Sequence, residues 1–477
     1  MIKSTMLLVA FLGLWLCTCF TVSIDTAYRR TWEATSRENR ELYLGLKAIL
    51  TDDQADSFLQ MTDEKQREEW LRKLWKSKDP TPTTERNEFK EEHERRVAYA
   101  KYYFGSYFKG ERLWDDRGKV YVKYGEPDER TTNLSGVLED IGKTFPDATP
   151  YFDMLAGEFW NYYRYNLQLQ FQDKRGNGYY ELVPYAEDIK LGYSKQNLEA
   201  IFAAEMISKI EIPTEKYAYD YGGEPLDYAL DVIRFRNSKD DYEISVNIGV
   251  PLGQLGRKDT NYISFLKSIV IFDNDYREVN RDGSEINTKV EQTVNSLAVS
   301  WSKFILKPGE YTIAVEVRDL ISQRVGIYKK SILLPGYVYS AQREISQIVM
   351  ATDIKEATLK DTLLMQRNGL LISCLPSRIY FPDQKIYFYY EIYDLKTDQE
   401  GKGYYIIQAD LVNTKTRKRV NLYTTNPIEC RSSDTYEMDI IDASKLKPAD
   451  YILYIKVKDV LADKEKKTVT AFRVEDK

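Results

Sequence analysis

The sequence predicts an α+β multi-domain protein, with an N-terminal helical region, a small mixed α/β domain and two C-terminal antiparallel β-sandwiches. Three observations lead to this prediction. Apolar residues repeat at helical spacing before about Gly110 and alternate as in β-strands after it. The chain contains 38 tyrosines, which favour strands, and one strand-rich motif occurs twice. At 477 residues the chain is also too long for one ordinary core, so several domains are expected.

Residues 1–23 are predicted to be a signal peptide. Lys3 precedes an uncharged run that is most apolar between Met6 and Leu16. Two alternatives remain: a retained membrane anchor, because about 20 apolar residues can cross a bilayer, and a lipoprotein lipidated at Cys17 or Cys19. The protein is therefore expected to be exported, and to be periplasmic, outer-membrane-associated or secreted. Membrane contact is expected only through such an anchor or lipid.

Removal of the predicted signal peptide changes the net charge and the number of cysteines. Loss of Lys3 changes the formal net charge from −6 to −7. Because phosphate binding needs a basic surface, no nucleic-acid partner is expected. Cys374 and Cys430 are the cysteines that remain, and in an oxidising compartment they are a candidate disulfide.

Residues 24–110 are predicted to be a helical region. Thr51 and Gln54 have the spacing of a capping box, in which each side chain bonds to the other residue's amide. A tryptophan-rich helix follows and should stop at Asp79-Pro80, since proline cannot continue a helix. The next helix, from about Thr84, carries His93 on its apolar stripe, where a packed side chain is expected rather than a catalytic base.

Residues 111–190 are predicted to be a strand-rich domain. Lys119–Tyr124 alternates apolar and polar residues and is expected to be a strand that ends at the Gly125–Asp128 corner. Residues 158–165 and 167–183 are predicted strands, the latter forming a hairpin around a glycine-rich turn. Residues 131–150 show no clear period and are expected to be loop, and a helical piece is expected at 194–206.

The C-terminal half contains an internal repeat. LKPGEYTIAVEVRDL at 306–320 returns 140 residues later as LKPADYILYIKVKDV at 446–460. Both copies have a Lys-Pro turn, an alternating strand and a final aspartate. Strands at this spacing over about 100 residues are typical of Ig-like sandwiches, predicted here at 226–337 and 368–477. Residues 338–367 are expected to be a linker.

Two blocks of the N-terminal half carry a family resemblance. WLRKLWKSKDPTPTTERNEFKEEHERRVAYAKYYF and DDRGKVYVKYGEPDE resemble the GWxTD-domain family of bacterial secreted proteins, most closely over residues 65–185. The resemblance implies a GWxTD-type domain within 111–190 and brings no established reaction. Where the family has Gly-Trp-x-Thr-Asp, this chain has Arg112–Asp116, with Trp shifted by one place and Thr replaced by Asp.

Enzymatic chemistry finds little support in the sequence. One histidine and the absence of HExxH, CxxC, GxSxG, GxxxxGK[ST] and GxGxxG motifs remove the usual hydrolase, redox and nucleotide-enzyme patterns. Acidic pairs flank Lys119–Tyr124, but a strand there would hold them about 20 Å apart, too far for the 5–10 Å of a glycosidase pair. Residues 273–285 fail the EF-hand pattern and are predicted to form a hairpin with an acidic tip. No cofactor and no metal are expected.

The motif residues are therefore predicted to form structural or binding turns, and not to be catalytic. We expect Asp116 to cap or bond the turn, Arg117 to pair with a carboxylate, Gly118 to supply a positive φ, and Asp128 to accept amides. The full set is Asp79, Pro80, Asp116, Arg117, Gly118, Tyr124, Gly125, Pro127 and Asp128. The expected function is that of a non-enzymatic envelope or secreted scaffold that binds an envelope protein or polysaccharide. The alternative is a carboxylate-dependent envelope hydrolase acting on glycan or peptide.

Overall fold

The computed structural model describes most of the chain between residues 32 and 476. The described residues are 32–33, 35–105, 113–133, 157–163, 167–183, 224–238, 241–256, 262–290, 295–336, 344–357 and 364–476. Strands predominate among them, and the α-helices lie in the N-terminal part. The predicted signal peptide, the predicted helix at 194–206 and most of the predicted loop at 131–150 lie outside the described residues. The predicted linker at 338–367 is described in part, and it is wrong where the strands Val349–Glu356 and Met365–Arg367 lie within it.

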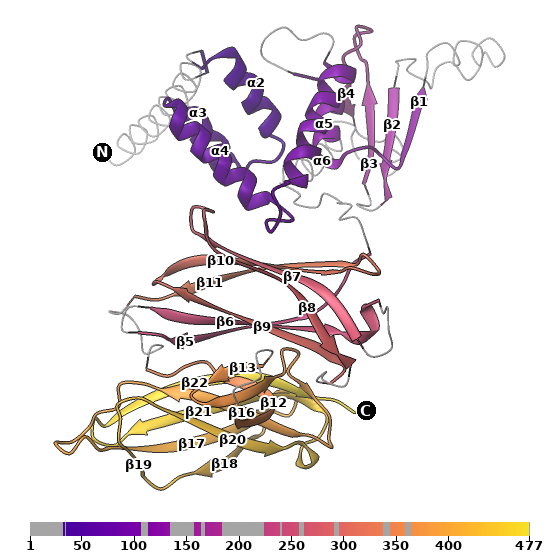
Figure 1. The fold of residues 1–477 in the computed structure, drawn as a ribbon. Coiled ribbons are helices and arrows are strands. Elements are labelled where there is room, and N and C mark those ends of the chain that lie inside the picture. The colour runs from indigo at the N-terminus through magenta and orange to yellow at the C-terminus, as the bar shows by residue number, and fades with distance from the viewer. Residues whose placement is uncertain are drawn as a thin grey trace, which may run out of the picture. The chain divides into compact units, whose positions relative to one another are not determined.

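The chain forms two compact units. The first comprises residues up to Pro80 together with 86–219, and the second comprises 81–85 together with 220–477. Figure 1 labels the helices and strands of both units. Each unit has its own cores.

The first unit begins with helices, as predicted. They are α2 (Arg37–Leu46), α3 (Asp52–Gln60), α4 (Glu64–Lys78), α5 (Glu88–Phe104) and α6 (Asp116–Tyr124). The predicted capping box is confirmed: Thr51 Oγ1 accepts from the Gln54 amide and Gln54 Oε1 accepts from the Thr51 amide. Aromatic and aliphatic side chains of α2 to α5, among them Phe58 and Phe89, form one core.

A four-stranded antiparallel sheet completes the first unit. It has the order β1-β2-β3-β4, with β1 (Glu129–Asn133), β2 (Gly157–Tyr162), β3 (Leu167–Gln172) and β4 (Glu181–Val183). Strands are thus confirmed within 158–165 and 167–183. Helices α5 and α6 share a core with this sheet, in which Phe104 and Tyr121 pack with Trp160 and Phe171.

The predicted strand at Lys119–Tyr124 is wrong, because these residues belong to helix α6. The Asp115 side chain caps the helix by accepting from the Arg117 amide, and Gly125, at φ 80°, ends it. An aspartate before the helix and a glycine after it are the ordinary start and stop features of a helix. Every residue of α6 except Asp116 and Lys119 is buried, so the alternation of Val120 and Val122 carried no information about which face was apolar.

In the second unit, the first sheet pair is built from residues 229–334. Its strands are β5 (Ala229–Arg236), β6 (Tyr242–Pro251), β7 (Tyr262–Asp273), β8 (Glu278–Lys289), β9 (Leu297–Leu306), β10 (Gly309–Asp319) and β11 (Val325–Leu334). One sheet has the order β5-β6-β9 and the other β11-β10-β7-β8, around a common core. The predicted hairpin at 273–285 is confirmed as the β7–β8 turn, where Asp273 accepts from the Asp275 and Arg277 amides.

The second sheet pair is built from residues 349–474. Its strands are β12 (Val349–Glu356), β13 (Met365–Arg367), β14 (Leu370–Cys374), β15 (Ile379–Tyr380), β16 (Lys385–Ile392), β17 (Gly403–Asn413), β18 (Arg419–Thr424), β19 (Ile428–Cys430), β20 (Thr435–Asp442), β21 (Ala449–Asp459) and β22 (Lys464–Val474). One sheet has the order β13-β14-β12-β16-β20 and the other β15-β22-β21-β17-β18, with β19 paired to β17.

The sequence repeat is also a repeat of topology. The order β5-β6-β9 in the first sheet pair corresponds to β12-β16-β20 in the second, and β11-β10-β7-β8 corresponds to β22-β21-β17-β18. The repeated motif supplies β10 and β21. In both copies its tyrosine donates to the backbone oxygen four residues earlier, at 3.1 Å from Tyr311 to Lys307 and at 2.8 Å from Tyr451 to Lys447.

The aspartates that end the two copies of the repeated motif accept similar hydrogen bonds. Asp319 accepts from the amides of Gly256 and Ser322, each at 2.8 Å. Asp459 accepts from the amides of Lys396 at 2.8 Å and Ala462 at 3.0 Å. Both carboxylates are almost completely buried and tie the end of their strand to a neighbouring loop.

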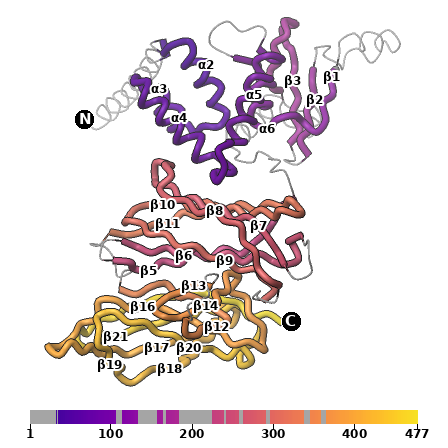
Figure 2. The backbone as a smooth tube through the Cα atoms, in the orientation of Figure 1, coloured from indigo at the N-terminus to yellow at the C-terminus, as the bar shows by residue number. Residues whose placement is uncertain are grey.

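The two sheet pairs are joined face to face rather than through a linker alone. In Figures 1 and 2 the strands β5, β6 and β9 of the first pair lie next to the second pair, near β13. A core spans this junction and includes Ile233 and Phe235 from β5 with Ile372 and Tyr389 from the second pair. Arg367 bridges the pairs by bonding to Glu243 of β6 and Glu391 of β16.

The candidate disulfide between Cys374 and Cys430 is not formed, since both are buried free thiols. Cys374 ends β14 and packs into the junction core beside Met365. Cys430 ends β19, in the other sheet of the pair, and packs into the interior core. The two side chains therefore belong to different cores.

Candidate functional site

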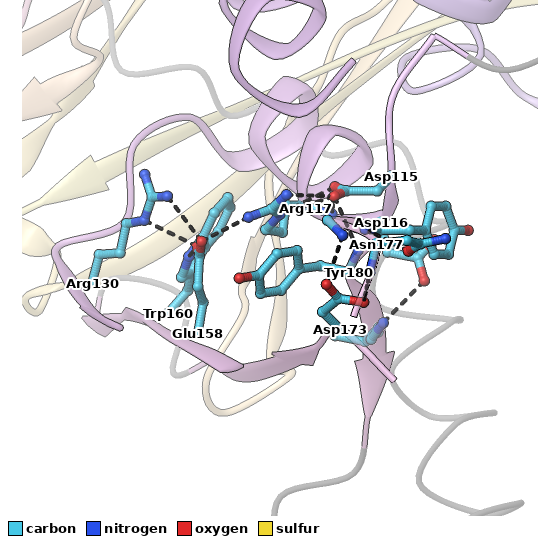
Figure 3. Close-up of polar contacts among 12 residues, drawn as sticks. Asp115, Asp116, Arg117, Arg130, Glu158, Trp160, Asp173, Asn177 and Tyr180 are labelled. Atoms are coloured by element: carbon cyan, nitrogen blue, oxygen red, sulfur yellow. Dashed lines mark hydrogen bonds and ion pairs between the residues drawn. The ribbon is translucent and has the colours of Figure 1, made fainter. Parts of the chain in front are cut away.

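The sequence motif around Asp115 and Arg117 lies at the centre of a buried ion-pair network. Figure 3 shows Arg117 of α6 between Asp115 and Glu158 of β2. Its Nη2 lies 2.6 Å from Asp115 Oδ2, and its Nη1 lies 2.7 Å from Glu158 Oε1. The arginine thus ties the start of the helix to the sheet.

The network continues along the sheet. Glu158 also accepts from Arg130 of β1, whose Nε and Nη2 lie 3.1 Å from its two oxygens, and from the Trp160 indole at 2.9 Å. Asp115 accepts further from the Tyr180 amide at 3.2 Å. Each of the four carboxylate oxygens therefore receives at least two hydrogen bonds, which is close to what a carboxylate oxygen can accept.

Burial and aromatic rings surround these charges. The Arg117 guanidinium carbon lies 3.6 Å from the centre of the Tyr180 ring, a close stacking distance. Burial raises the pKa of Asp115, and Arg117 opposes the shift. Burial would also raise the pKa of Glu158, but Arg130 and Arg117 outweigh it and leave this pKa below its usual value. The network is a closed structural unit in which no carboxylate oxygen of the two acids is left to take up a proton or a ligand.

The other acidic motif residues bond to backbone or lysine. Asp116 accepts from the Leu182 amide at 3.0 Å and pairs with Lys119 at 2.9 Å. Asp128 accepts from the Tyr163 amide at 2.7 Å. The two aspartates bind strands β4 and the end of β2 respectively, and the structure does not bring them together.

The glycines act differently from the expectation. Gly118 is helical and does not have a positive φ; a Cβ there would lie 2.3 Å from the Trp114 ring, so glycine lets the helix pack on this side chain. The positive φ belongs to Gly125. Arg96 of α5 approaches that corner and donates to the Lys123 carbonyl at 3.1 Å, which satisfies the end of α6. The run Arg95–Ala100 of α5 therefore contacts the corner at Gly125–Asp128.

The remaining motif residues lie in the packed structure. Asp79 is buried at the C-terminus of α4 and pairs with Lys76 at 2.8 Å, and Pro80 follows it. Tyr124 is buried against Tyr162, with ring centres 5.5 Å apart, and Pro127 is buried beyond it. His93 packs between Phe89 and Trp75, and burial lowers its pKa to about 4. An uncharged, packed imidazole fits its place on the apolar stripe.

Sequence reasoning missed Glu158, Arg130 and Tyr180, which complete the network. Glu158 carried a usable indication: a carboxylate in an aromatic strand needs a partner if it is buried, and Arg117 was already expected to pair with a carboxylate. Nothing in the sequence linked Tyr180 to Asp115, because that bond depends on where β4 is placed.

No group of three or more His, Cys, Asp or Glu side chains fit to hold a metal occurs among the described residues. Within the same part of the chain, no helix is long and apolar enough to cross a membrane. No known protein-family model matches the chain, and comparison with curated proteins finds no significant match.

Proposed function

We propose that this chain is an exported, non-enzymatic scaffold or interaction protein of the bacterial cell envelope. In this proposal residues 111–190 are a GWxTD-type domain, the two sheet pairs are Ig-like sandwich domains, and the partner is another envelope protein or a polysaccharide. Fold alone does not define function, so the support has to come from particular contacts.

The observation that carries the proposal is the junction between the two sheet pairs. Phe235 of the first pair packs with Tyr389 of the second. The guanidinium carbon of Arg367 lies 3.9 Å from the centre of the Phe235 ring. The same guanidinium forms ion pairs with Glu243 of the first pair and Glu391 of the second. Arg378 adds a second bridge, 2.7 Å from Asp231 of β5. A shared apolar core with satisfied charges joins the two pairs within one compact unit, which is suited to presenting surfaces on both pairs.

The hydrolase alternative is weakened by the state of the acids in the first unit. Asp115 and Glu158 are each saturated by hydrogen bonds, and Arg117 lies between them. A general acid or base needs an oxygen free to exchange a proton with a substrate. The motif acids would have to break this network before they acted.

The test compares partner retention by the protein and by a variant whose junction is broken. Arg367→Ala, in the mature protein, should loosen the two sheet pairs and lower the yield of the partners that co-purify from the native envelope. Arg324→Ala is the matched control, because it removes an exposed ion pair with Glu224 at 2.8 Å. Equal partner yield from all three proteins, with small-angle scattering showing that Arg367→Ala has separated the pairs, would contradict the proposal.

Export is tested separately. The intact mass of the protein from the envelope should correspond to a chain that begins near Ile24. A mass that retains residues 1–23, or adds a lipid at Cys17 or Cys19, would replace cleavage by anchoring. Recovery only from the cytoplasm would contradict an envelope role.

A further inference from the structure

The pairing register aligns the interiors of the two sheet pairs residue by residue. In the first pair Lys267 of β7 lies opposite Val317 of β10; 140 residues later, Ile407 of β17 lies opposite Val457 of β21. Lys267 and Ile407 therefore occupy corresponding positions. Two residues further along these strands, Asp282 of β8 lies opposite Ile269 of β7, and Tyr423 of β18 lies opposite Ala409 of β17. Asp282 therefore corresponds to Tyr423.

In the first sheet pair this interior position holds a cation that the chain itself supplies. Lys267 is buried, and its Nζ lies 3.2 Å from Ser300 Oγ and 2.6 Å from Ser302 Oγ, both on β9. The Trp301 carbonyl at 3.1 Å and Asp282 at 3.2 Å complete its contacts. The ammonium is thus compensated by one carboxylate and surrounded by oxygens.

In the second sheet pair the same region is acidic. Strand β20, which corresponds to β9, directs Glu437 and Asp439 to the interior, where Tyr405 of β17 donates to Glu437 and the Tyr423 hydroxyl interacts with Asp439. Neither acid forms an ion pair with a lysine or arginine among the described residues. Burial raises the pKa of Glu437 and the neighbouring Asp439 raises it further, while Tyr405 opposes the shift. Two adjacent carboxylates therefore share a partly buried region without a positive charge.

A third tyrosine points into this cluster. Tyr390 of β16 lies directly opposite Glu437 in the sheet register and is completely buried. Its hydroxyl has no hydrogen-bond partner among the described residues, although Tyr405, Tyr423, Glu437 and Asp439 all lie near enough to affect its pKa. A buried hydroxyl without a partner is costly, so an ion or a water that contacted the Tyr390 hydroxyl would stabilise the fold.

We propose that Glu437, Asp439 and the hydroxyls of Tyr390, Tyr405 and Tyr423 form a binding site for a divalent cation of the calcium class. The atoms that would bind the ion are all oxygens, and oxygen is the ligand atom that Ca²⁺ and similar hard cations prefer. Two carboxylates match the charge of one such ion. Because only two donors are anionic, the affinity should fall in the range of about 10⁻⁴ to 10⁻³ M that is typical of extracellular calcium modules.

Terbium luminescence tests the site, since excited tyrosines next to bound Tb³⁺ sensitise its emission. The full mature protein should give tyrosine-sensitised emission that millimolar Ca²⁺ displaces. The double variant Glu437→Gln/Asp439→Asn should lose this component, with calcium affinity by calorimetry reduced at least tenfold. Asp442→Asn, at the exposed end of the same strand, is the matched control and should bind as the wild type does.

Two further variants separate a direct role from a structural one. Tyr390→Phe keeps the packing and should weaken calcium binding several-fold. Ile407→Lys places an ammonium at the position that corresponds to Lys267 in the first sheet pair. Calcium should raise the thermal midpoint of the wild type but not that of this variant, because the ammonium replaces the ion. With a chelator present, the thermal midpoint of the variant should be higher than that of the wild type.

Three results would overturn the proposal. They are calcium binding that is the same in the double variant and the wild type, no calcium binding to a folded wild-type protein, and binding of methylammonium without binding of calcium. The third result would assign the site to an organic ammonium group, the chemistry of Lys267. Circular dichroism on each variant shows whether the sheets are retained, so a loss of binding is interpreted only for folded protein.

Discussion

The two sheet pairs of the second unit share their strand order but differ in the charges they enclose. Both have the same outer framework, including a tyrosine bonded four residues back and a buried aspartate at the end of the repeated strand. Between the sheets, the first pair encloses Lys267 with two serines and Asp282, whereas the second encloses Glu437 and Asp439 with tyrosines.

This difference shows which parts of the repeat are tied to the fold. The framework residues bond to backbone groups, and the strand order is the same in both copies, so the same side chains serve twice. Interior polar residues bond to other side chains, and a set of side chains can change together. Function is therefore more readily sought where the copies differ than where they agree.

The largest effect is expected from breaking the junction that holds the two pairs together. Arg367→Ala leaves Glu391 and Glu243 buried without their shared partner and should cost about 3–5 kcal/mol of unfolding free energy. The single urea-unfolding transition expected for the second unit should then divide into two, one for each sheet pair. A single transition with an unchanged midpoint would show that the pairs are not coupled through this arginine.

A smaller loss is expected from the matched aspartates of the repeat. Asp319→Ala and Asp459→Ala each leave several partly buried amides without an acceptor and should each cost about 2 kcal/mol. The corresponding asparagine variants keep one acceptor oxygen and should lose less. If the unfolding free energies of the two alanine variants differ by more than about 2 kcal/mol, the two aspartates are not equivalent in the two sheet pairs.

The matched tyrosines should have a still smaller and equal effect. Tyr311→Phe and Tyr451→Phe remove one hydrogen bond each to Lys307 and Lys447 and should cost about 1 kcal/mol. Tyr454→Phe, at an exposed position of the same strand as Tyr451, should be neutral. Thermal unfolding of the three variants checks this prediction, and a loss in only one copy would contradict it.

The smallest expected effect is a change in pH dependence. The raised pKa of Glu437 means that the folded state binds its proton more tightly than the unfolded state, so this group's stabilising contribution is present below about pH 4.5 and is lost as pH rises through the raised value. Glu437→Gln should flatten that loss, measured by urea unfolding in chelator.

The contribution of Asp319 to stability has the opposite pH dependence. Burial opposes its ionisation, but hydrogen bonds from Ser322 and Gly256 outweigh burial and lower its pKa. Its contribution is present above about pH 3.8 and is lost as pH falls through the lowered value. If Glu437→Gln and the wild type have the same pH dependence above pH 4.5, the raised pKa of Glu437 does not contribute to stability, which contradicts this prediction.

Sequence reasoning predicted the β-rich C-terminal half, the capping box and the hairpin at 273–285, because each depends on a local pattern. It failed at Lys119–Tyr124, where an alternating stretch is a helix. The helix is buried on nearly all sides, so periodicity did not distinguish the two structures, and the Asp115 cap and Gly125 stop were the better guide. It also offered Cys374 and Cys430 as a candidate disulfide, whereas the side chains are free thiols that pack into different cores.

The sequence by itself determined the repeat and therefore the shared framework of the two sheet pairs, since residues that satisfy their own strand and turn need only local order. Only the tertiary structure decided that Arg117 has Asp115 on one side and Glu158 on the other, that the pairs share a core at Phe235 and Tyr389, and that Tyr390 lies opposite Glu437. These contacts join residues far apart in the chain, and their partners are chosen by burial, which penalises every charge or hydroxyl left without one.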